Sequence, residues 1–283
     1  MAIISVSRGC YSHGKKIAQL VADELGYQCV GREIVIEAAD FYKIPKEVLL
    51  KSLHDAPGLL ERITHGRDRF LAGFQATLLQ HVQKDNVVYH GHAGHLLLPP
   101  IRHIFKVRII ADMQERIKLL QEERSLLPAD AEKEIEREDR NRAHWTRYLY
   151  NRDINDARLY DMVVHIGTFK IEDVCRVICE TARSASFQST DESRNAVKDL
   201  AISSQIQVAL MPIADAEVTS HMGAVHIRVA ARKIRQFDFT NQNVQSKLRH
   251  QLNVELNNKI LEVAGQVPGV KTVACDIDSP ELS

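Results

Sequence analysis

Apolar and polar positions over residues 1–183 follow two alternating patterns, which predict strands separated by helices. Short apolar runs are typical of buried strands, and they lie at 2–6, 27–30, 86–90, 105–111 and 162–166. Helical spacing follows the first run, since apolar residues recur three and four positions apart over 17–25 and Gly26 then provides a stop. Charged helices are predicted over 113–150 and an amphipathic helix over 171–183. This alternation predicts an α/β fold with a parallel sheet covered by helices on both faces.

Apolar positions near the C-terminus follow a different order. A helical pattern near 195–210 precedes two alternating runs on either side of Gly223, which is the pattern of a β-hairpin. A helix from about 241 to 265 and a strand at 272–277 complete the order α-β-β-α-β. These elements predict a second, small α+β domain.

The polar segment 184–193 lacks apolar periodicity and is predicted to be a linker. We therefore expect a first domain at 1–183 and a second at 194–283. The length of 283 residues agrees with two domains, at roughly 100–200 residues per domain.

Charge and cysteine content narrow the class of protein. Lys plus Arg and Asp plus Glu are equal at 37 each, so no overall field favours nucleic acid, and no nucleic-acid partner is expected. The 5 cysteines lack C-x-x-C spacing, which favours reduced thiols. No apolar stretch approaches the roughly 18 residues of a membrane span, and the first run is too short for a signal peptide. We expect a cytoplasmic protein. The sequence does not indicate its oligomeric state.

The segment Gly-Cys-Tyr-Ser-His-Gly-Lys-Lys at 9–16 carries the clearest candidate chemistry. A strand, a glycine-bounded loop ending in lysine and a helix form the phosphate cradle of nucleotide-binding folds, although a tight turn can produce the same short pattern by chance. The candidate phosphate-binding residues are Gly9, Ser12, His13, Gly14, Lys15 and Lys16. Lys16 stands where the usual pattern has a hydroxyl that holds Mg²⁺, so binding of Mg²⁺ stays open.

Four segments, taken in order, resemble the cytidylate kinase-like branch of the nucleoside monophosphate kinases. They are Ser5 to Arg8 before the loop, 25–34 after the first helix, the Asp-Arg-Asn-Arg-Ala run at 139–143, and 156–161 before the strand at 162–166. The resemblance implies a P-loop fold with a helical lid, with ATP on the loop and a nucleoside monophosphate such as CMP opposite. It implies catalytic roles for Lys15 and for lid arginines Arg137, Arg140 and Arg142. It also implies acceptor binding by Arg32, Arg67 and His92.

Three departures from that family leave the activity open. Lys16 replaces the hydroxyl ligand, Tyr11 and His13 stand where glycine is preferred, and His92 stands where the family usually has arginine. A nucleotide-binding kinase is the first reading. A degenerate nucleotide or anion sensor is the second. The lid segment can also be a solvated helix with i,i+4 ion pairs.

The C-terminal part is similar to BON domains through Gly223, Val225 and Ile227 in its hairpin and through the run Val-Pro-Gly-Val at 267–270. This resemblance implies a protein or lipid partner and gives a third reading, a non-enzymatic interaction protein.

Other residue clusters allow more than one interpretation. Histidines at 90, 92, 95 and 103 suggest either a metal site or neutral histidines lining an anion pocket, and we predict no metal. Cys175 and Cys179 are expected in the core, while Trp145 and its neighbouring tyrosines can stack on a base or pack within the lid.

Overall fold

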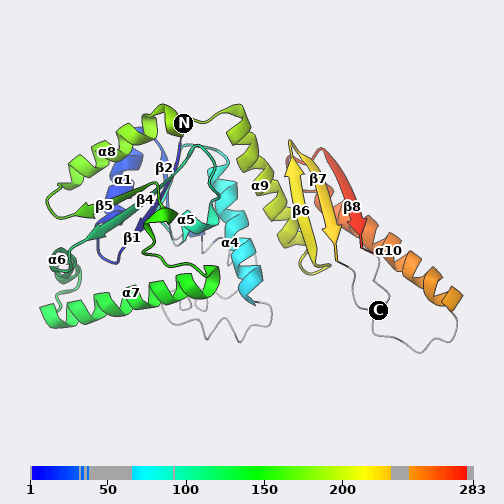
Figure 1. Cartoon of the computed structure of the whole chain (residues 1–283), viewed down its shortest axis with the longest axis horizontal. Coiled ribbons are helices and arrows are strands. Elements are labelled where there is room, and N and C mark those ends of the chain that lie inside the picture. Colours follow the sequence, from blue (N-terminus) through cyan, green and yellow to red (C-terminus); the bar gives the residue numbers. More distant parts are fainter. Residues whose placement is uncertain are drawn as a thin grey trace. The chain divides into compact units, whose positions relative to one another are not determined.

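The computed structural model describes residues 2–31, 33–34, 37, 66–91, 93–230 and 242–278, and the side chains among these except those of 66–70 and 242–249. The chain divides into two compact units, Met1–Arg194 and Asn195–Ser283. Each has its own sheet and hydrophobic core. Figure 1 shows the elements of both units along the chain.

The first unit contains a five-stranded parallel sheet in the order β2-β3-β1-β4-β5. Its strands are β1 Ile3–Arg8, β2 Gln28–Val30, β3 Val87–Tyr89, β4 Ile104–Ala111 and β5 Met162–Ile166. The predicted parallel sheet is thus confirmed, with strand ends within two residues of the expected positions. Because β1 lies between β3 and β4, the loop that follows it opens at the middle of the sheet.

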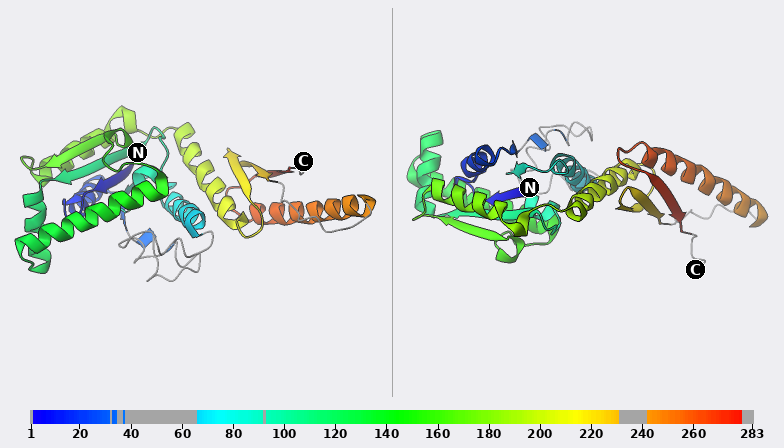
Figure 2. Two further views of the ribbon diagram at one scale, coloured as in Figure 1. Left: turned by 60° about the horizontal axis from the view of Figure 1, so that its bottom comes forward. Right: turned by 90° about the horizontal axis from the view of Figure 1, so that it is seen from above.

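Helices cover both faces of this sheet, as the two views in Figure 2 show. The described helices of this unit are α1 Gly14–Leu25, α4 Gly66–Val82, α5 Gly94–Leu97, α6 Met113–Arg124, α7 Pro128–Tyr150 and α8 Ile171–Arg183. Apolar side chains of α1 and α8, including Ile17, Val21 and Ile178, form one core with Ile4 and Val6 of β1. The long charged stretch at 113–150 is two helices, because Ser125 ends α6 in a left-handed conformation and Pro128 begins α7.

The second unit has the predicted order α-β-β-α-β, with helices packed on one face of a three-stranded sheet. Its elements are α9 Asp191–Leu210, whose first four residues belong to the first unit, β6 Ala216–His221, β7 Ala224–Val229, α10 Gln242–Gly265 and β8 Thr272–Ile277. β6 and β7 are antiparallel and β7 and β8 are parallel. Ile206, Ile227 and Ile260 lie in the core.

The helix predicted near residue 195 begins earlier, at Asp191. Thr190 and Ser193 explain the earlier start, because each side chain accepts a hydrogen bond from the backbone N–H of the other, at 3.1 and 2.9 Å. Such reciprocal bonds satisfy free N–H groups at a helix start. A short 3-10 helix, Ala185–Phe187, precedes it, so the segment expected as a linker contains local structure.

Candidate functional site

The loop from Gly9 to His13 joins β1 to α1. Hydrogen bonds within the loop and to β4 fix its shape. The backbone N–H of Gly9 donates to the carbonyl of Ile109 on β4, at 3.0 Å. The buried Ser12 hydroxyl lies 3.0 Å from the Gly9 carbonyl and 3.2 Å from the Ile109 carbonyl, and it donates to them. Ser12, predicted as a phosphate-binding residue, therefore uses its hydroxyl to shape the loop.

The two residues that stand where glycine is preferred are both in the left-handed region, Tyr11 at φ 53° and His13 at φ 60°. Left-handed backbone is costly for side chains other than glycine and persists only when the surroundings fix it. The surroundings here are acidic, since Tyr11 donates to Glu138 at 3.3 Å and the Nε2 atom of His13 lies 3.1 Å from Glu115. Tyr11 and His13, which replace glycine, are therefore each held by a glutamate side chain.

The N-terminus of α1 is open toward the loop. His13 is its N-cap, but the His13 side chain makes no capping bond. The backbone N–H of Ile17, which donates to the His13 carbonyl at 2.9 Å, is the first in the helix to reach an intrahelical acceptor. The N–H groups of Gly14, Lys15 and Lys16 come before it, and such first-turn donors attract anions.

Arg8, the last residue of β1, packs against the start of this helix at Gly14. A Cβ atom on Gly14 would approach the Cβ and Cδ atoms of Arg8 to 2.6 Å, so only glycine fits there. The Arg8 guanidinium donates to the His90 carbonyl and lies 3.2 Å from His90 Nδ1. Burial, reinforced by the Arg8 charge, lowers the pKa of His90 from 6.5 to about 4, which keeps this imidazole neutral at pH 7.

The loop and α1 border a cavity of about 780 Å³ with an excess of positive charge. Five cationic side chains and two carboxylates, those of Glu123 and Glu138, line it; the cations are Arg8, Lys15, Lys16, Arg124 and Arg142. Leu20 and Leu119 add apolar surface. A cavity of this size and charge suits a polyanion with an apolar part.

The lid helix α7 contacts the end of β1 and the loop through three side chains. Arg142 donates to the Arg8 carbonyl at 2.8 Å. Asp139 accepts from the backbone N–H of Cys10 at 3.3 Å and from the Arg116 guanidinium at 2.6 Å. Glu138 accepts from Tyr11. One predicted lid arginine, Arg142, is therefore at the cavity.

The other two lid arginines lie elsewhere on α7. Arg140 pairs with Glu136 at 3.2 Å, four residues earlier, and its side chain is 68% exposed. Arg137 is exposed as well, and neither residue lines the cavity. The structure thus combines both interpretations of the lid segment, because one part of the helix contacts the loop and another carries a solvated ion pair.

Two buried arginines lie near the loop that the sequence patterns do not predict as site residues. Arg116 on α6 donates to the Cys10 carbonyl at 2.7 Å as well as to Asp139. Arg108 on β4 is 7% exposed and donates to Ser7 at 3.4 Å, Tyr160 at 3.2 Å and Asn155 at 3.0 Å. A signal was present in the sequence, since Lys106 and Arg108 alternate with apolar residues in a predicted strand.

None of the predicted acceptor-binding side chains lies within the described part of the chain. Arg32 and His92 lie outside the described residues, and the side chain of Arg67 does as well. Two residues before His92 in the sequence, His90 follows β3 and has the Arg8 guanidinium against it.

The remaining clusters have these positions. Within the described ranges, no group of three or more His, Cys, Asp or Glu residues is arranged to hold a metal. Cys175 and Cys179 lie in the core, as predicted, and burial raises the pKa of Cys179 to about 12. Trp145 is 1% exposed, so it packs within the protein. None of the helices in the described part of the chain is long and apolar enough to cross a membrane.

Comparison with known proteins gives one family and several structural similarities. The model of the cytidylate kinase-like family matches residues 3–168. An uncharacterized protein from Eubacterium ventriosum ATCC 27560 aligns with a TM-score of 0.51 at 16% identity, over 65% of this chain and 99% of that chain. At this identity the similarity concerns the fold. No curated protein matches the sequence.

Two further structures align with lower scores. TT1252 from Thermus thermophilus has a TM-score of 0.42 at 13% identity, over 64% of this chain and 95% of that chain. A shikimate kinase from Bacteroides thetaiotaomicron has a TM-score of 0.40 at 11% identity, over 65% and 99%.

Proposed function

Because this chain belongs to the cytidylate kinase-like family, we propose that it binds ATP or a related nucleoside triphosphate at the loop between β1 and α1. We further propose that it transfers the terminal phosphoryl group to a nucleoside monophosphate such as CMP. The observation that carries the proposal is the positive cavity at an uncapped helix N-terminus, beside a lid helix that contributes Arg142.

The residues at this cavity fit a triphosphate. Five cations against two carboxylates leave an excess of positive charge for a ligand that carries about four negative charges. The first-turn N–H groups of α1 and the Lys15 ammonium would hold phosphate oxygens, as they do in other loops of this kind. Arg142 would add the lid charge. Leu20 and Leu119 offer apolar surface to the nucleoside.

The loop does not fit an ordinary Mg²⁺ site. Lys16 replaces the usual hydroxyl, and the neighbouring Ser12 hydroxyl donates to two carbonyls inside the loop. An ammonium cannot coordinate a cation. We therefore assign charge neutralisation at the phosphates to Lys15, Lys16 and Arg142, and leave the metal out of the proposal.

A second candidate function is a nucleotide or anion sensor that binds without transferring phosphate. It is favoured by Asp139, whose carboxylate accepts the Cys10 N–H and so places a negative charge against the loop. The C-terminal unit supports such a role through its α-β-β-α-β order and its similarity to BON domains, which imply a protein or lipid partner. A third candidate is a non-enzymatic interaction protein, in which the C-terminal unit alone binds the partner.

The experiment is titration calorimetry with ATP on the full chain and on Lys15→Ala, followed by an assay of ADP release with a panel of nucleoside monophosphates. We expect Lys15→Ala to weaken ATP binding at least tenfold, about 1.4 kcal/mol. Lys118→Ala is the matched control, because Lys118 is exposed on α6 and does not line the cavity.

The outcomes separate the three functions. Release of ADP that depends on a nucleoside monophosphate supports the kinase. Tight binding of ATP without ADP release, in the presence of every monophosphate, supports the sensor. If Lys15→Ala binds ATP with unchanged affinity, the loop is not the nucleotide site. This result would contradict both the kinase and the sensor, and would favour the interaction protein.

A further inference from the structure

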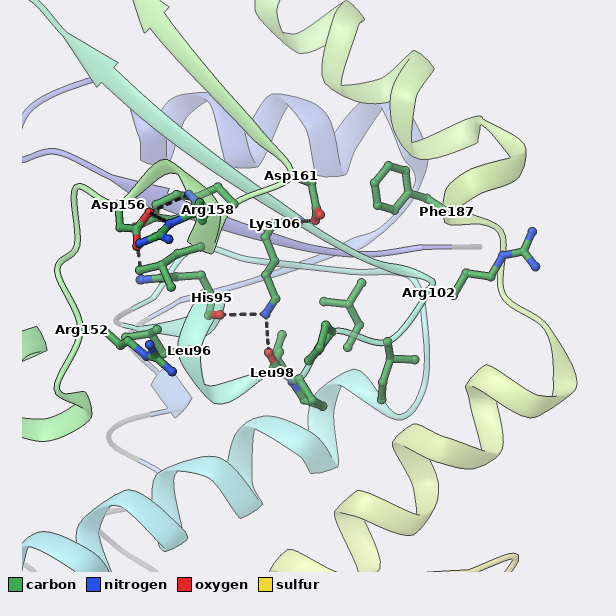
Figure 3. Close-up of a pocket in the computed structure, with 16 residues that line it drawn as sticks. His95, Leu96, Leu98, Arg102, Lys106, Arg152, Asp156, Arg158, Asp161 and Phe187 are labelled. Atoms are coloured by element: carbon green, nitrogen blue, oxygen red, sulfur yellow. Dashed lines mark hydrogen bonds and ion pairs between the residues drawn. The ribbon is translucent and has the colours of Figure 1, made fainter.

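The first unit has a second cavity, of about 740 Å³, formed where strand β4 begins (Figure 3). It shares no lining residue with the loop cavity. Lys106, which lines it, is in register with Ser5 of β1, whereas the loop begins after Arg8. Three residues of strand separate these positions, about 10 Å. A ligand here would thus occupy a separate site.

The wall of this second cavity is rich in charge, and its acidic groups already have partners. Four cations line it, Arg102, Lys106, Arg152 and Arg158, together with the carboxylates of Asp156 and Asp161. Asp156 accepts hydrogen bonds from the Arg158 guanidinium at 2.9 to 3.2 Å. Asp161 accepts from the backbone N–H of Lys106 at 2.8 Å. With four cations and two carboxylates, the lining of this cavity has a net positive charge.

Lys106 occupies the centre of this arrangement. Its ammonium donates to the carbonyls of His95 at 2.9 Å and Leu98 at 2.6 Å, and Figure 3 shows the side chain reaching between them. An ammonium has three N–H groups, so one is left for a ligand. Burial lowers the pKa of Lys106. An anion bound beside the ammonium would oppose this lowering, because it favours the charged form.

Arg152 supplies a second cation on one side of the cavity. It follows α7 by two residues, its side chain is exposed, and in the described part of the chain it makes no hydrogen bond or ion pair. In Figure 3 it lies on the same side as the Asp156–Arg158 pair, with Lys106 between it and Phe187. A ligand that reaches both Lys106 and Arg152 would thus meet two positive charges.

Part of the cavity lining is apolar. Leu98, Pro99, Ile101, Ile104 and Phe187 line it. The Phe187 ring packs on Phe105 with centroids 4.4 Å apart, which fixes its position. Small-molecule sites typically combine an enclosed volume of roughly 300–1,000 Å³, an apolar wall and a few placed polar groups.

We propose that this cavity binds a small organic anion, with its oxyanion group at Lys106 and Arg152 and its apolar ring or chain against Leu98, Ile101 and Phe187. The proposal does not depend on the nucleotide site, because the two cavities are lined by different residues. Phosphate alone would lack the apolar contact, and a neutral ring would lack the ionic one.

The test is titration calorimetry with phenyl phosphate on the full chain, compared with inorganic phosphate and benzyl alcohol. We expect phenyl phosphate to bind at least tenfold more tightly than either fragment. Arg152→Ala should weaken its binding about tenfold, and Arg152→Lys should restore most of the affinity because it keeps the charge. Both variants change an exposed side chain and should fold.

Two control variants locate the binding. Lys15→Ala removes one of the five cations that line the loop cavity, and Arg176→Ala removes an exposed arginine of α8 that pairs with Asp173. Neither should change phenyl phosphate affinity by more than twofold. Loss of binding in Lys15→Ala with none in Arg152→Ala would place the probe in the loop and overturn the proposal. Equal affinity for benzyl alcohol and phenyl phosphate would overturn it as well.

Discussion

The two glycines that bound the loop are expected to differ in their tolerance of a side chain, although the sequence pattern treats them alike. At Gly14 an added Cβ would lie 2.6 Å from both Cβ and Cδ of Arg8. At Gly9 the nearest atom would be the Ser12 hydroxyl at 3.7 Å, an ordinary contact, and the φ angle lies outside the left-handed region. Gly14→Ala and Gly9→Ala thus form a matched pair within one loop.

The cost of Gly14→Ala follows from what must move. The Cβ atom of Arg8 belongs to a buried strand, so either the start of α1 shifts or the Arg8 guanidinium leaves His90. Overpacking costs about 1–3 kcal/mol, and a hydrogen bond from a charged group contributes about 1.5–3 kcal/mol. We expect a loss of about 3 kcal/mol, and a fall in Tm of about 6–12 °C at 2–4 °C per kcal/mol.

Urea unfolding followed by circular dichroism measures both variants, and titration with ATP then compares the folded proteins. Gly9→Ala should stay within about 1 kcal/mol of the natural protein and keep its ATP affinity. Gly14→Ala should lose both stability and affinity. The reasoning would be refuted if the two variants were equally stable, because the contact with Arg8 would then be of no consequence.

Three further predictions use other features of the first unit and the segment after it. Because Lys16 replaces a hydroxyl ligand, chelation of Mg²⁺ should change ATP affinity only a few-fold by calorimetry; a hundredfold loss would show that another group holds the metal. Since His90 has a folded-state pKa of about 4 against an ordinary 6.5, the unfolded chain binds its proton first as the pH falls. Stability should therefore decrease from about pH 6.5 to pH 4, and His90→Gln should flatten this decrease in urea titrations; parallel curves for both proteins would contradict it. Brief proteolysis should cut within 184–190 and leave two folded fragments, with ATP binding confined to the first, whereas an unfolded C-terminal fragment would mean that the units fold together.

Local patterns predict the elements of this fold well, and for physical reasons. The predicted and observed bounds of β5 and β8 coincide, because period-two alternation or a short apolar run is a property of the segment itself. Helix α9 begins four residues before its predicted start, because the hydroxyls of Thr190 and Ser193 cap it and the polar composition of this segment predicts a linker.

The candidate site is less predictable because its contacts join distant segments. Lys15 and Gly14 could be read from the loop pattern. The placement of Arg8 against His90, 82 residues apart, depends on the parallel pairing of β1 with β3. The separation of Arg142 from Arg140 depends on which side of α7 meets the loop, and a charged helix with little apolar periodicity does not reveal this.

The central place of β1 in the sheet has a consequence for synthesis of the protein on the ribosome. Ile3 pairs with Val87 on one side and with Ile104 on the other. Both edges of β1 can therefore be paired only after about 100 further residues have been synthesised. At about 5–20 residues per second this wait lasts roughly 5–20 s. During that time α1 can cover one face of the strand, but the unpaired backbone of an apolar strand promotes aggregation. Any shortened version of the first unit should therefore extend beyond Ala111, where β4 ends, if it is to remain in solution.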